Sequence, residues 1–330
     1  MNDGASGDPR ISEPLLRVEH LVVEYLVHGQ IVHAVSDVSL DVRRGETLGL
    51  VGESGCGKST LGRAVLQLHP PRSGRVVFDG EDLTQIRGRR LRQMRRRLQL
   101  IFQDPAAALN PRRRIGDIVA EPLVIAGMAD AAERRRRVHE VLHAVGLDLD
   151  LAGQRRPHEF SGGQCQRIAI ARALVLEPEL IICDEPVSAL DVLIRAQILN
   201  LLEAMKARYG LTLLFIAHDL AVVKAISDRV AVMYLGKLAE VGSTEDIFRR
   251  PAHPYTAVLL QAIPVPDPRA RLAARLAVGE PPSPISPPSG CRFRTRCPRA
   301  AERCAAEPPA MRQVAPDHLA ACHFPLPPHG

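Results

Sequence analysis

The feature that most constrains this chain is a nine-residue segment, Gly52–Thr60, which reads Gly-Glu-Ser-Gly-Cys-Gly-Lys-Ser-Thr. It fits the pattern G-x-x-x-x-G-K-[ST], whose glycines let successive backbone N–H groups surround a phosphate. Lys58 offers a positive charge to the outer phosphates, and the Ser59 hydroxyl offers a ligand to Mg²⁺. An apolar strand is predicted before the loop, at 47–51, and a helix after it, at 61–68. A glycine-rich turn that merely contains Lys-Ser would not explain this order of elements. The chain is therefore predicted to bind a nucleoside triphosphate.

Composition narrows the class of protein. The chain has 330 residues, of which 46% are apolar, so it is expected to form one large domain or one domain with an appendage. Its net charge of +6 comes from arginines in bursts at 87–97, 112–114 and 134–137. These bursts alternate with apolar residues and lack aromatic neighbours that would stack on bases, so solvated helix faces are expected and a nucleic-acid partner is not.

No run of about 18 apolar residues is present, so no membrane-spanning segment is expected. The N-terminus has neither the basic start nor the apolar core of a secretory signal. We therefore expect a cytoplasmic chain whose seven cysteines are reduced.

The pattern of apolar residues predicts an α/β fold. Residues 1–14 are polar and expected to be disordered. Antiparallel strands are expected at 16–25, 34–42 and 74–80, and a hairpin at 230–241. The stretch 110–175 has helical periodicity. Two buried parallel strands, at 180–183 and 211–217, flank a helix at 192–209. Residues 264–290 are rich in proline and indicate a linker along the surface.

Two further segments suggest hydrolysis of the bound nucleotide. Asp184 and Glu185 end a predicted buried strand, the edge where ligands bind in open α/β sheets. Asp184 is expected in the Mg²⁺ shell, and Glu185 is expected to orient or deprotonate the attacking water. The second segment, Ser161–Gln164, starts a predicted helix and offers a second anion site.

These motifs occur in a fixed order: the phosphate loop, Gln103 in Ile-Phe-Gln-Asp104, Ser161-Gly-Gly-Gln164, Asp184-Glu185, Ser188-Ala-Leu-Asp191 and His218. The set resembles that of ABC-type ATPases. It is most similar to the ATP-binding subunits of bacterial dipeptide and oligopeptide importers, in particular the F-type member of the pair. Arg195-Ala-Gln197, His253-Pro-Tyr-Thr256 and the cysteine-rich end support this, and the resemblance covers about residues 16–330.

The resemblance implies a P-loop NTPase (RecA-like) core with an antiparallel β subdomain, a helical signature subdomain at about 105–175, and a cysteine-rich C-terminal extension. The nucleotide-binding domain would span 15–250 and the extension 251–330.

The resemblance also implies a head-to-tail dimer with ATP and Mg²⁺ between two subunits, so that Ser161–Gln164 serves the partner's nucleotide. The implied catalytic residues are Glu185, His218, Lys58 and Gln103, and Mg²⁺ would be held by Ser59, Gln103 and Asp184. The implied nucleotide contacts are Tyr25 (stacked on adenine), Gly52, Glu53, Ser54, Gly55, Cys56, Gly57, Lys58, Ser59, Thr60, Gln103, Asp184, Asp191 and, from the other subunit, Ser161, Gly162, Gly163 and Gln164.

The implied partners are a second ABC ATPase subunit, two membrane permease subunits and an extracytoplasmic peptide-binding protein, with this chain peripheral at the cytoplasmic face of the membrane. Family pairing favours a heterodimer over a homodimer. The residues leave open an importer for another cargo, such as nickel or glutathione, and a soluble ABC ATPase without transport.

Four cysteines, Cys291, Cys297, Cys304 and Cys322, lie in the last forty residues. In a reducing compartment such a group indicates a metal site more than disulfides. Zinc and metal-free thiols stay open on this spacing. The resemblance suggests a 4Fe–4S cluster with a structural role.

Overall fold

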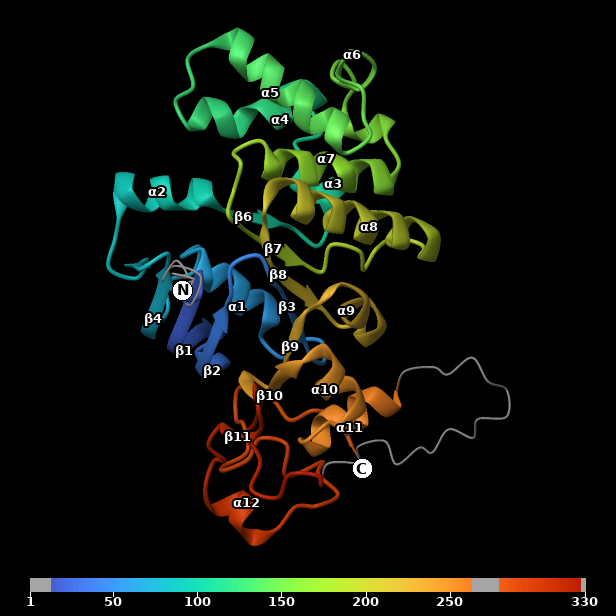
Figure 1. Ribbon diagram of the computed structural model, residues 1–330. Helices are drawn as coiled ribbons and strands as arrows, with labels where there is room; N and C mark the ends of the chain where they lie inside the picture. The colour runs from blue at the N-terminus through green and yellow to red at the C-terminus, as the bar shows by residue number, and fades with distance from the viewer. Residues whose placement is uncertain (1–12, 263–278, 328–330) are drawn as a thin grey trace, which may run out of the picture.

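The structure, a computed structural model, describes residues 13–262 and 279–327. Its centre is an eight-stranded sheet in the order β11-β12-β10-β9-β3-β8-β7-β6 (Figure 1). Five strands are parallel: β3 (Thr47–Val51), β6 (Leu98–Ile101), β7 (Leu180–Asp184), β8 (Thr212–Ala217) and β9 (Arg229–Tyr234). β10 (Lys237–Ser243) runs antiparallel to β9 and forms the predicted hairpin with it.

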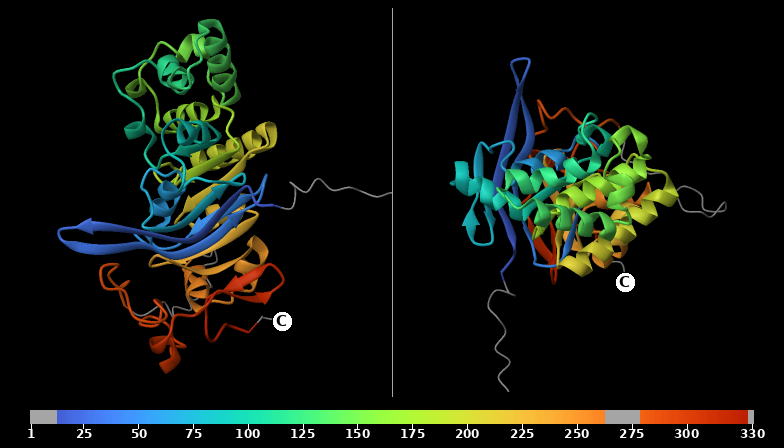
Figure 2. Two further views of the ribbon diagram at one scale, coloured as in Figure 1. Left: turned by 90° about the vertical axis from the view of Figure 1, so that its left-hand side faces the viewer. Right: turned by 90° about the horizontal axis from the view of Figure 1, so that it is seen from above.

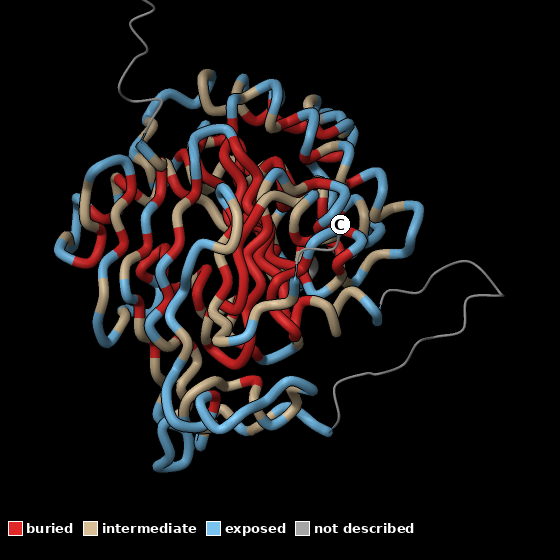
Figure 3. Tube along the Cα trace, turned by 60° about the horizontal axis from the view of Figure 1, so that its bottom comes forward, coloured by how far each residue is buried: buried red, intermediate tan, exposed pale blue. Residues whose placement is uncertain are grey.

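The parallel strands are buried on both faces, as Figure 3 shows along the centre of the molecule. Neighbouring residues of one strand enter two different cores: Leu213 and Phe215 of β8 point to one, and Leu214 and Ile216 to the other. A strand covered on both sides needs a continuous apolar run, which is why β7 and β8 were recognisable in the sequence. β6 was not predicted, because its four residues follow an arginine-rich helix without a turn signal.

The second sheet is antiparallel, in the order β2-β1-β4-β5. It consists of β1 (Leu16–Val27), β2 (Gln30–Val42), β4 (Ser73–Phe78) and β5 (Glu81–Asp82). The strands predicted in this region are confirmed, although β1 and β2 are longer than expected. Figure 2 shows them as a long hairpin that projects beyond the body of the molecule.

Helices surround the main sheet, and the predicted helical middle is confirmed. Above the sheet in Figure 1 lie α3 (Pro105–Ala108), α4 (Ile115–Ile125), α5 (Ala131–Ala144), α6 (Leu149–Ala152) and α7 (Gly162–Leu174), with a short 3₁₀ turn at Pro157–Glu159. The others before residue 250 are α1 (Lys58–Val65), α2 (Gly88–Arg97), α8 (Val192–Tyr209), α9 (Leu220–Ile226) and α10 (Thr244–Arg249). The helix expected at 192–209 is α8.

The C-terminal part packs onto the same sheet. After α11 (Pro254–Gln261) and α12 (Glu302–Ala306), the short strands β11 (Arg312–Ala315) and β12 (His318–Ala320) extend the sheet beyond β10. Phe293 is 1% exposed and belongs to the core formed by the main sheet and its helices. The predicted linker and the predicted disordered start lie largely outside the described residues.

Candidate functional site

The phosphate loop connects β3 to α1 and has the backbone shape that its glycines permit. Gly57 precedes the helix with φ of 107°, a left-handed conformation that side chains disfavour. A Cβ at Gly57 would lie 2.0 Å from the Ala34 carbonyl oxygen, and a Cβ at Gly52 would lie 2.0 Å from that of Met233. Both glycines are therefore required by close contact with neighbouring backbone.

Lys58 stands at the first position of α1 and is almost completely buried. Its Nζ donates hydrogen bonds to the carbonyl oxygens of Gly52, at 2.8 Å, and Glu53, at 3.0 Å. The loop thus folds around the ammonium group. This arrangement gives a buried cation a polar environment made of backbone carbonyl oxygens.

Asp184 ends β7 opposite the loop and is 1% exposed. The Ser59 hydroxyl donates to its Oδ1 at 2.6 Å. Among the described residues, Oδ2 accepts no hydrogen bond, and Arg63 lies 3.7 Å from it. Burial raises the pKa of Asp184, while the Ser59 hydrogen bond and the Arg63 charge oppose that rise. A buried carboxylate oxygen without a donor, beside a hydroxyl, fits the oxygen ligands that Mg²⁺ prefers.

Glu185 is the next residue, and its carboxylate contacts side chains that follow two neighbouring strands. Its Oε2 lies 3.1 Å from Nε2 of Gln103 and 3.1 Å from Nδ1 of His218. Gln103 follows β6, Glu185 follows β7 and His218 follows β8, so adjacent parallel strands bring them together. Glu185 itself has φ of 49°, and its backbone N–H donates to the Ile216 carbonyl oxygen. The carboxylate is thereby held at the carboxyl edge of the sheet.

Lys58, Ser59 and Glu185 line one cavity of about 540 Å³, and Asp184, which is buried beneath Ser59, does not line it directly. Its lining includes Tyr25, Ser54, Gly55, Gly57, Lys58, Ser59, Thr60, Gln103, Glu185 and His218. Tyr25 comes from the antiparallel sheet, and its ring meets that of His69 edge-on at 5.6 Å. Sequence reasoning missed three lining residues, Val32, Ala34 and Pro284. They are apolar side chains without a motif, and only the fold brings them to the loop.

Several predicted residues do not line this cavity. Ser161 caps α7: its Oγ accepts from the Gln164 N–H at 3.4 Å, and the Gln164 side chain accepts from the Ser161 N–H at 3.0 Å. Asp191 caps α8 by accepting from the Ile194 N–H. Gly162, like Ser161 and Gln164, is exposed, and Gly163 is half-buried. The sequence Ser161–Gln164 therefore presents a helix start to the surrounding solvent.

The remaining predicted loop residues have internal contacts. The Cys56 thiol is buried, which raises its pKa, and Gly52 binds Lys58 through its carbonyl oxygen. Glu53 faces the C-terminal part of the chain: its carboxylate pairs with Arg296 at 2.8 Å, and its N–H donates to the Tyr255 hydroxyl at 3.0 Å. Sequence reasoning gave no sign of these two contacts.

The four C-terminal cysteines come together around a second, very small cavity. Cys304 is buried and the other three are half-buried, and none forms a disulfide. Burial raises the pKa of Cys291 and Cys297, and it raises that of Cys322 to about 11. Within residues 13–262 and 279–327, no three potential ligands stand in an arrangement that would hold a metal ion.

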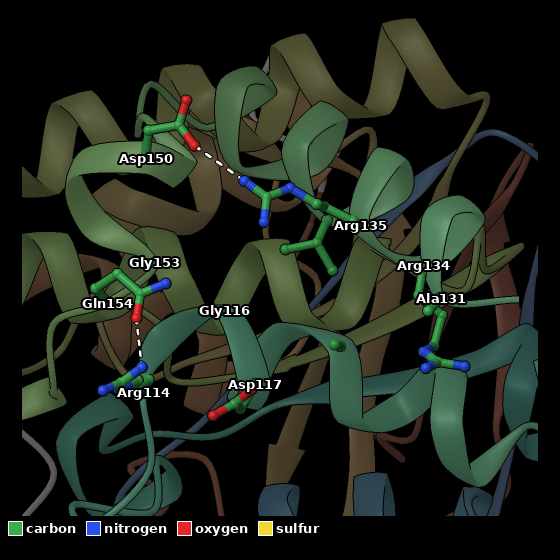
Figure 4. A pocket seen from close by; sticks show the side chains of 11 residues that line it. Arg114, Gly116, Asp117, Ala131, Arg134, Arg135, Asp150, Gly153 and Gln154 are labelled. Atoms are coloured by element: carbon green, nitrogen blue, oxygen red, sulfur yellow. Dashed lines mark hydrogen bonds and ion pairs between the residues drawn. The ribbon is translucent and has the colours of Figure 1, made fainter.

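Another cavity, of about 280 Å³, lies among the helices above the sheet (Figure 4). Arg135 pairs there with Asp150 at 3.3 Å, and Arg114 donates to Gln154. None of the predicted site residues lines it. The predicted nucleotide-binding residues therefore gather at the cavity beside the phosphate loop and not at this one.

Comparison with known proteins settles the family. A family model described as "ABC transporter" matches residues 35–188, and one described as "Oligopeptide/dipeptide transporter, C-terminal region" matches residues 239–304. A putative peptide import ATP-binding protein of Brucella ovis is 53% identical over 309 residues, covering 94% of this chain and 97% of the relative. This chain belongs to the ABC transporter ATPases.

Other relatives agree with that assignment. The oligopeptide transport ATP-binding protein OppF of Haemophilus influenzae is 50% identical and covers 94% of this chain and 97% of its own length. Its counterpart AppF of Bacillus subtilis is 50% identical, with coverages of 89% and 90%. Among solved structures, the ATP-binding cassette MJ0796, as a dimer bound to ADP and phosphate, superposes with a TM-score of 0.63 at 29% identity, covering 69% of this chain and 98% of that one.

Membership settles the general chemistry and the fold. This ABC ATPase has the cassette fold, binds ATP with Mg²⁺ and hydrolyses it. None of the helices in the described part of the chain is long and apolar enough to cross a bilayer.

Proposed function

We propose that Glu185 polarises the water that attacks the γ-phosphate of ATP. The observation that supports this role is the hydrogen bonding of its carboxylate to Gln103 and His218, which fixes its orientation at the edge of the cavity. Lys58 would hold the charge of the outer phosphates, and Ser59 and Asp184 would hold Mg²⁺. Bound Mg²⁺ neutralises charge on the phosphates during transfer. The protein's contribution is positioning and electrostatic stabilisation.

A Glu185→Gln variant tests this role. The amide can still be hydrogen-bonded but cannot accept a proton, so hydrolysis should fall at least tenfold, a barrier rise above about 1.4 kcal/mol. ATP binding should persist. Glu177→Gln is the matched control, because Glu177 carries an exposed carboxylate that is absent from the cavity lining. Turnover equal to the wild type would rule out the proposed role of Glu185.

The second ATP-binding surface is proposed to come from a partner subunit. Ser161–Gln164 is outside this chain's own cavity and partly exposed at the start of α7, a position that favours anion binding by helix N–H groups. We infer that it closes over the nucleotide held by the other subunit of a dimer, and family pairing favours a heterodimer. Binding of ATP from two sides would then favour the closed dimer.

We propose that the cargo is a di- or oligopeptide. The match of residues 239–304 to the oligopeptide/dipeptide transporter region and the printed names of the relatives support this cargo. The chain would be peripheral at the cytoplasmic face of the membrane, with two permease subunits and an extracytoplasmic peptide-binding protein. The test is to purify the tagged chain from detergent-solubilised membranes, identify the chains that accompany it, and measure peptide-stimulated ATPase activity after reconstitution. Stimulation by nickel or glutathione, but not by peptides, would refute the peptide cargo.

The permease contact is proposed at a basic cavity of about 770 Å³ between α2, α4 and α7. Three of its arginines, Arg89, Arg92 and Arg96, form no ion pair with any described residue, so the cavity suits an acidic cytoplasmic segment. Arg92→Glu should reduce co-purification of the permease while preserving ATP binding by the isolated chain. Arg135→Glu, in the separate cavity of Figure 4, is the control.

We propose that the four C-terminal cysteines hold a 4Fe–4S cluster with a structural role. The support is that all four line one cavity; a soft metal or cluster is the group that thiolates prefer. Burial raises the pKa of Cys291, Cys297 and Cys322, which favours the protonated form of these three thiols when no metal is bound. Anaerobically purified protein should absorb broadly in the visible range and contain about four irons per chain, and a Cys297→Ser/Cys304→Ser variant should lose both. An iron-free, colourless but active protein would eliminate the cluster.

A further inference from the structure

Glu53 is the residue at which the C-terminal part of the chain meets the phosphate loop. Three of its groups are engaged by three different residues. The carbonyl oxygen accepts from Lys58 at 3.0 Å, the N–H donates to the Tyr255 hydroxyl at 3.0 Å, and the carboxylate binds Arg296 at 2.8 and 3.0 Å. The last two partners lie 202 and 243 residues away in the sequence.

Arg296 is well placed to fix that carboxylate. Its side chain is 10% exposed, stacks over the Tyr234 ring at 5.8 Å and lies 3.4 Å from the Tyr234 hydroxyl. It belongs to a tight turn in which the Arg296 N–H donates to the Phe293 carbonyl oxygen, and Phe293 is part of the core. Packing against the Tyr234 ring and the turn at Phe293 therefore fixes the Arg296 guanidinium. The Glu53 carboxylate that it binds has little freedom to move.

A carboxylate at this position of the loop is a problem for the binding of a triphosphate. Glu53 does not line the nucleotide cavity, but the next residue, Ser54, does. An unpaired carboxylate there would repel the phosphates as a like charge and would compete with them for the Lys58 ammonium group. Pairing with Arg296 removes both effects, because it neutralises the charge and holds the side chain away from the cavity.

We propose that Arg296 is a positioning residue for ATP binding: it neutralises Glu53 and keeps that side chain out of the nucleotide site. The C-terminal extension thereby contributes to the loop's affinity for phosphate, beyond the hydrolysis chemistry and cargo assigned above. The inference rests only on ATP binding at the loop, so failure of the peptide or cluster proposals does not affect it.

The experiment compares Arg296→Met, Glu53→Gln and the double variant in the full-length chain. Affinities for ATP, ADP and adenosine are measured by competition with a fluorescent ATP analogue, and KM and kcat are measured for ATP. Arg303→Met is the matched control: it removes an exposed arginine of the extension whose ion-pair partner is Glu307. Thermal unfolding checks that each variant folds.

Arg296→Met should weaken ATP binding about tenfold and raise KM, with kcat changed less than about twofold, since it leaves one unpaired charge beside the site. The loss should be smaller for ADP, less than twofold for adenosine, and reduced by high salt. Glu53→Gln should stay within about threefold of wild type, because it removes the charge that needs a partner.

The double variant decides between this proposal and a merely structural role. In the Glu53→Gln background there is no carboxylate to neutralise. Adding Arg296→Met to this background should therefore reduce the affinity for ATP less than about twofold. Equal losses in both backgrounds, or equal losses for adenosine and ATP, would overturn the proposal. If Arg296→Met alone fails to fold, the double variant still tests it: affinity for ATP within about threefold of wild type supports the proposal, and a tenfold loss overturns it.

Discussion

Replacing Phe293 by alanine should destabilise the whole domain, even though Phe293 lies in the C-terminal extension. Its ring is 1% exposed and packs against the rings of Tyr234, Tyr255 and His253, with centroid distances of 5.2, 5.3 and 5.9 Å. Truncation of a buried Phe leaves a cavity and costs about 3–5 kcal/mol. For a chain of this size, each kcal/mol lost lowers the midpoint of thermal unfolding by roughly 2–4 °C, so the midpoint should fall by about 6–20 °C.

The assay is thermal unfolding followed by circular dichroism, with Phe324→Ala as the control. Phe324 is 38% exposed, so its loss should cost about 1 kcal/mol or less. Affinity for ATP should also fall in Phe293→Ala, because Tyr255 packs on Phe293 and accepts the Glu53 N–H. A fall of less than about 2 °C, equal to that of the control, would refute the reasoning that the extension shares the core of the ATPase.

Two other predictions concern single residues. Burial lowers the pKa of His253 to about 4 from 6.5, so the unfolded state binds a proton to this residue first as pH falls. The contribution of His253 to the free energy of unfolding should be constant well above pH 6.5 and fall by up to roughly 3 kcal/mol towards pH 4. His253→Asn, which keeps a helix cap, should remove that part of the pH dependence, measured as the difference between wild type and variant in urea unfolding from pH 7 to about pH 4. Gly57→Ala should abolish ATP binding in the competition assay, since its Cβ would meet the Ala34 carbonyl oxygen at 2.0 Å; binding at wild-type affinity would contradict the loop geometry.

The local parts of the site were predictable from the sequence. The phosphate loop, Asp184 and Glu185 each combine a chemical group with a neighbouring strand or helix, so their position follows from local rules. The convergence of His218 on Glu185 follows in the same way, because both residues stand at the ends of predicted parallel strands. Gln103 follows β6, which was not predicted, so only the resemblance implied its place in the site.

The long-range parts were not predictable. Arg296 and Tyr255 contact Glu53 although each is more than 200 residues away in the sequence, and no local pattern around either residue indicates this contact. β11 and β12 have four and three residues, too few for a period of two to be read, and their pairing depends on β10. Tertiary packing decided these features, and local propensity did not.

The central claim is that a complete ATP site needs the Ser161–Gln164 segment of a second subunit. The most direct test is to measure ATP affinity and turnover for Ser161→Arg beside Lys58→Ala. We predict that Ser161→Arg binds ATP within about twofold of wild type but hydrolyses it at least tenfold more slowly, whereas Lys58→Ala loses binding. Full turnover by Ser161→Arg, or a loss of binding equal to that of Lys58→Ala, would contradict the account.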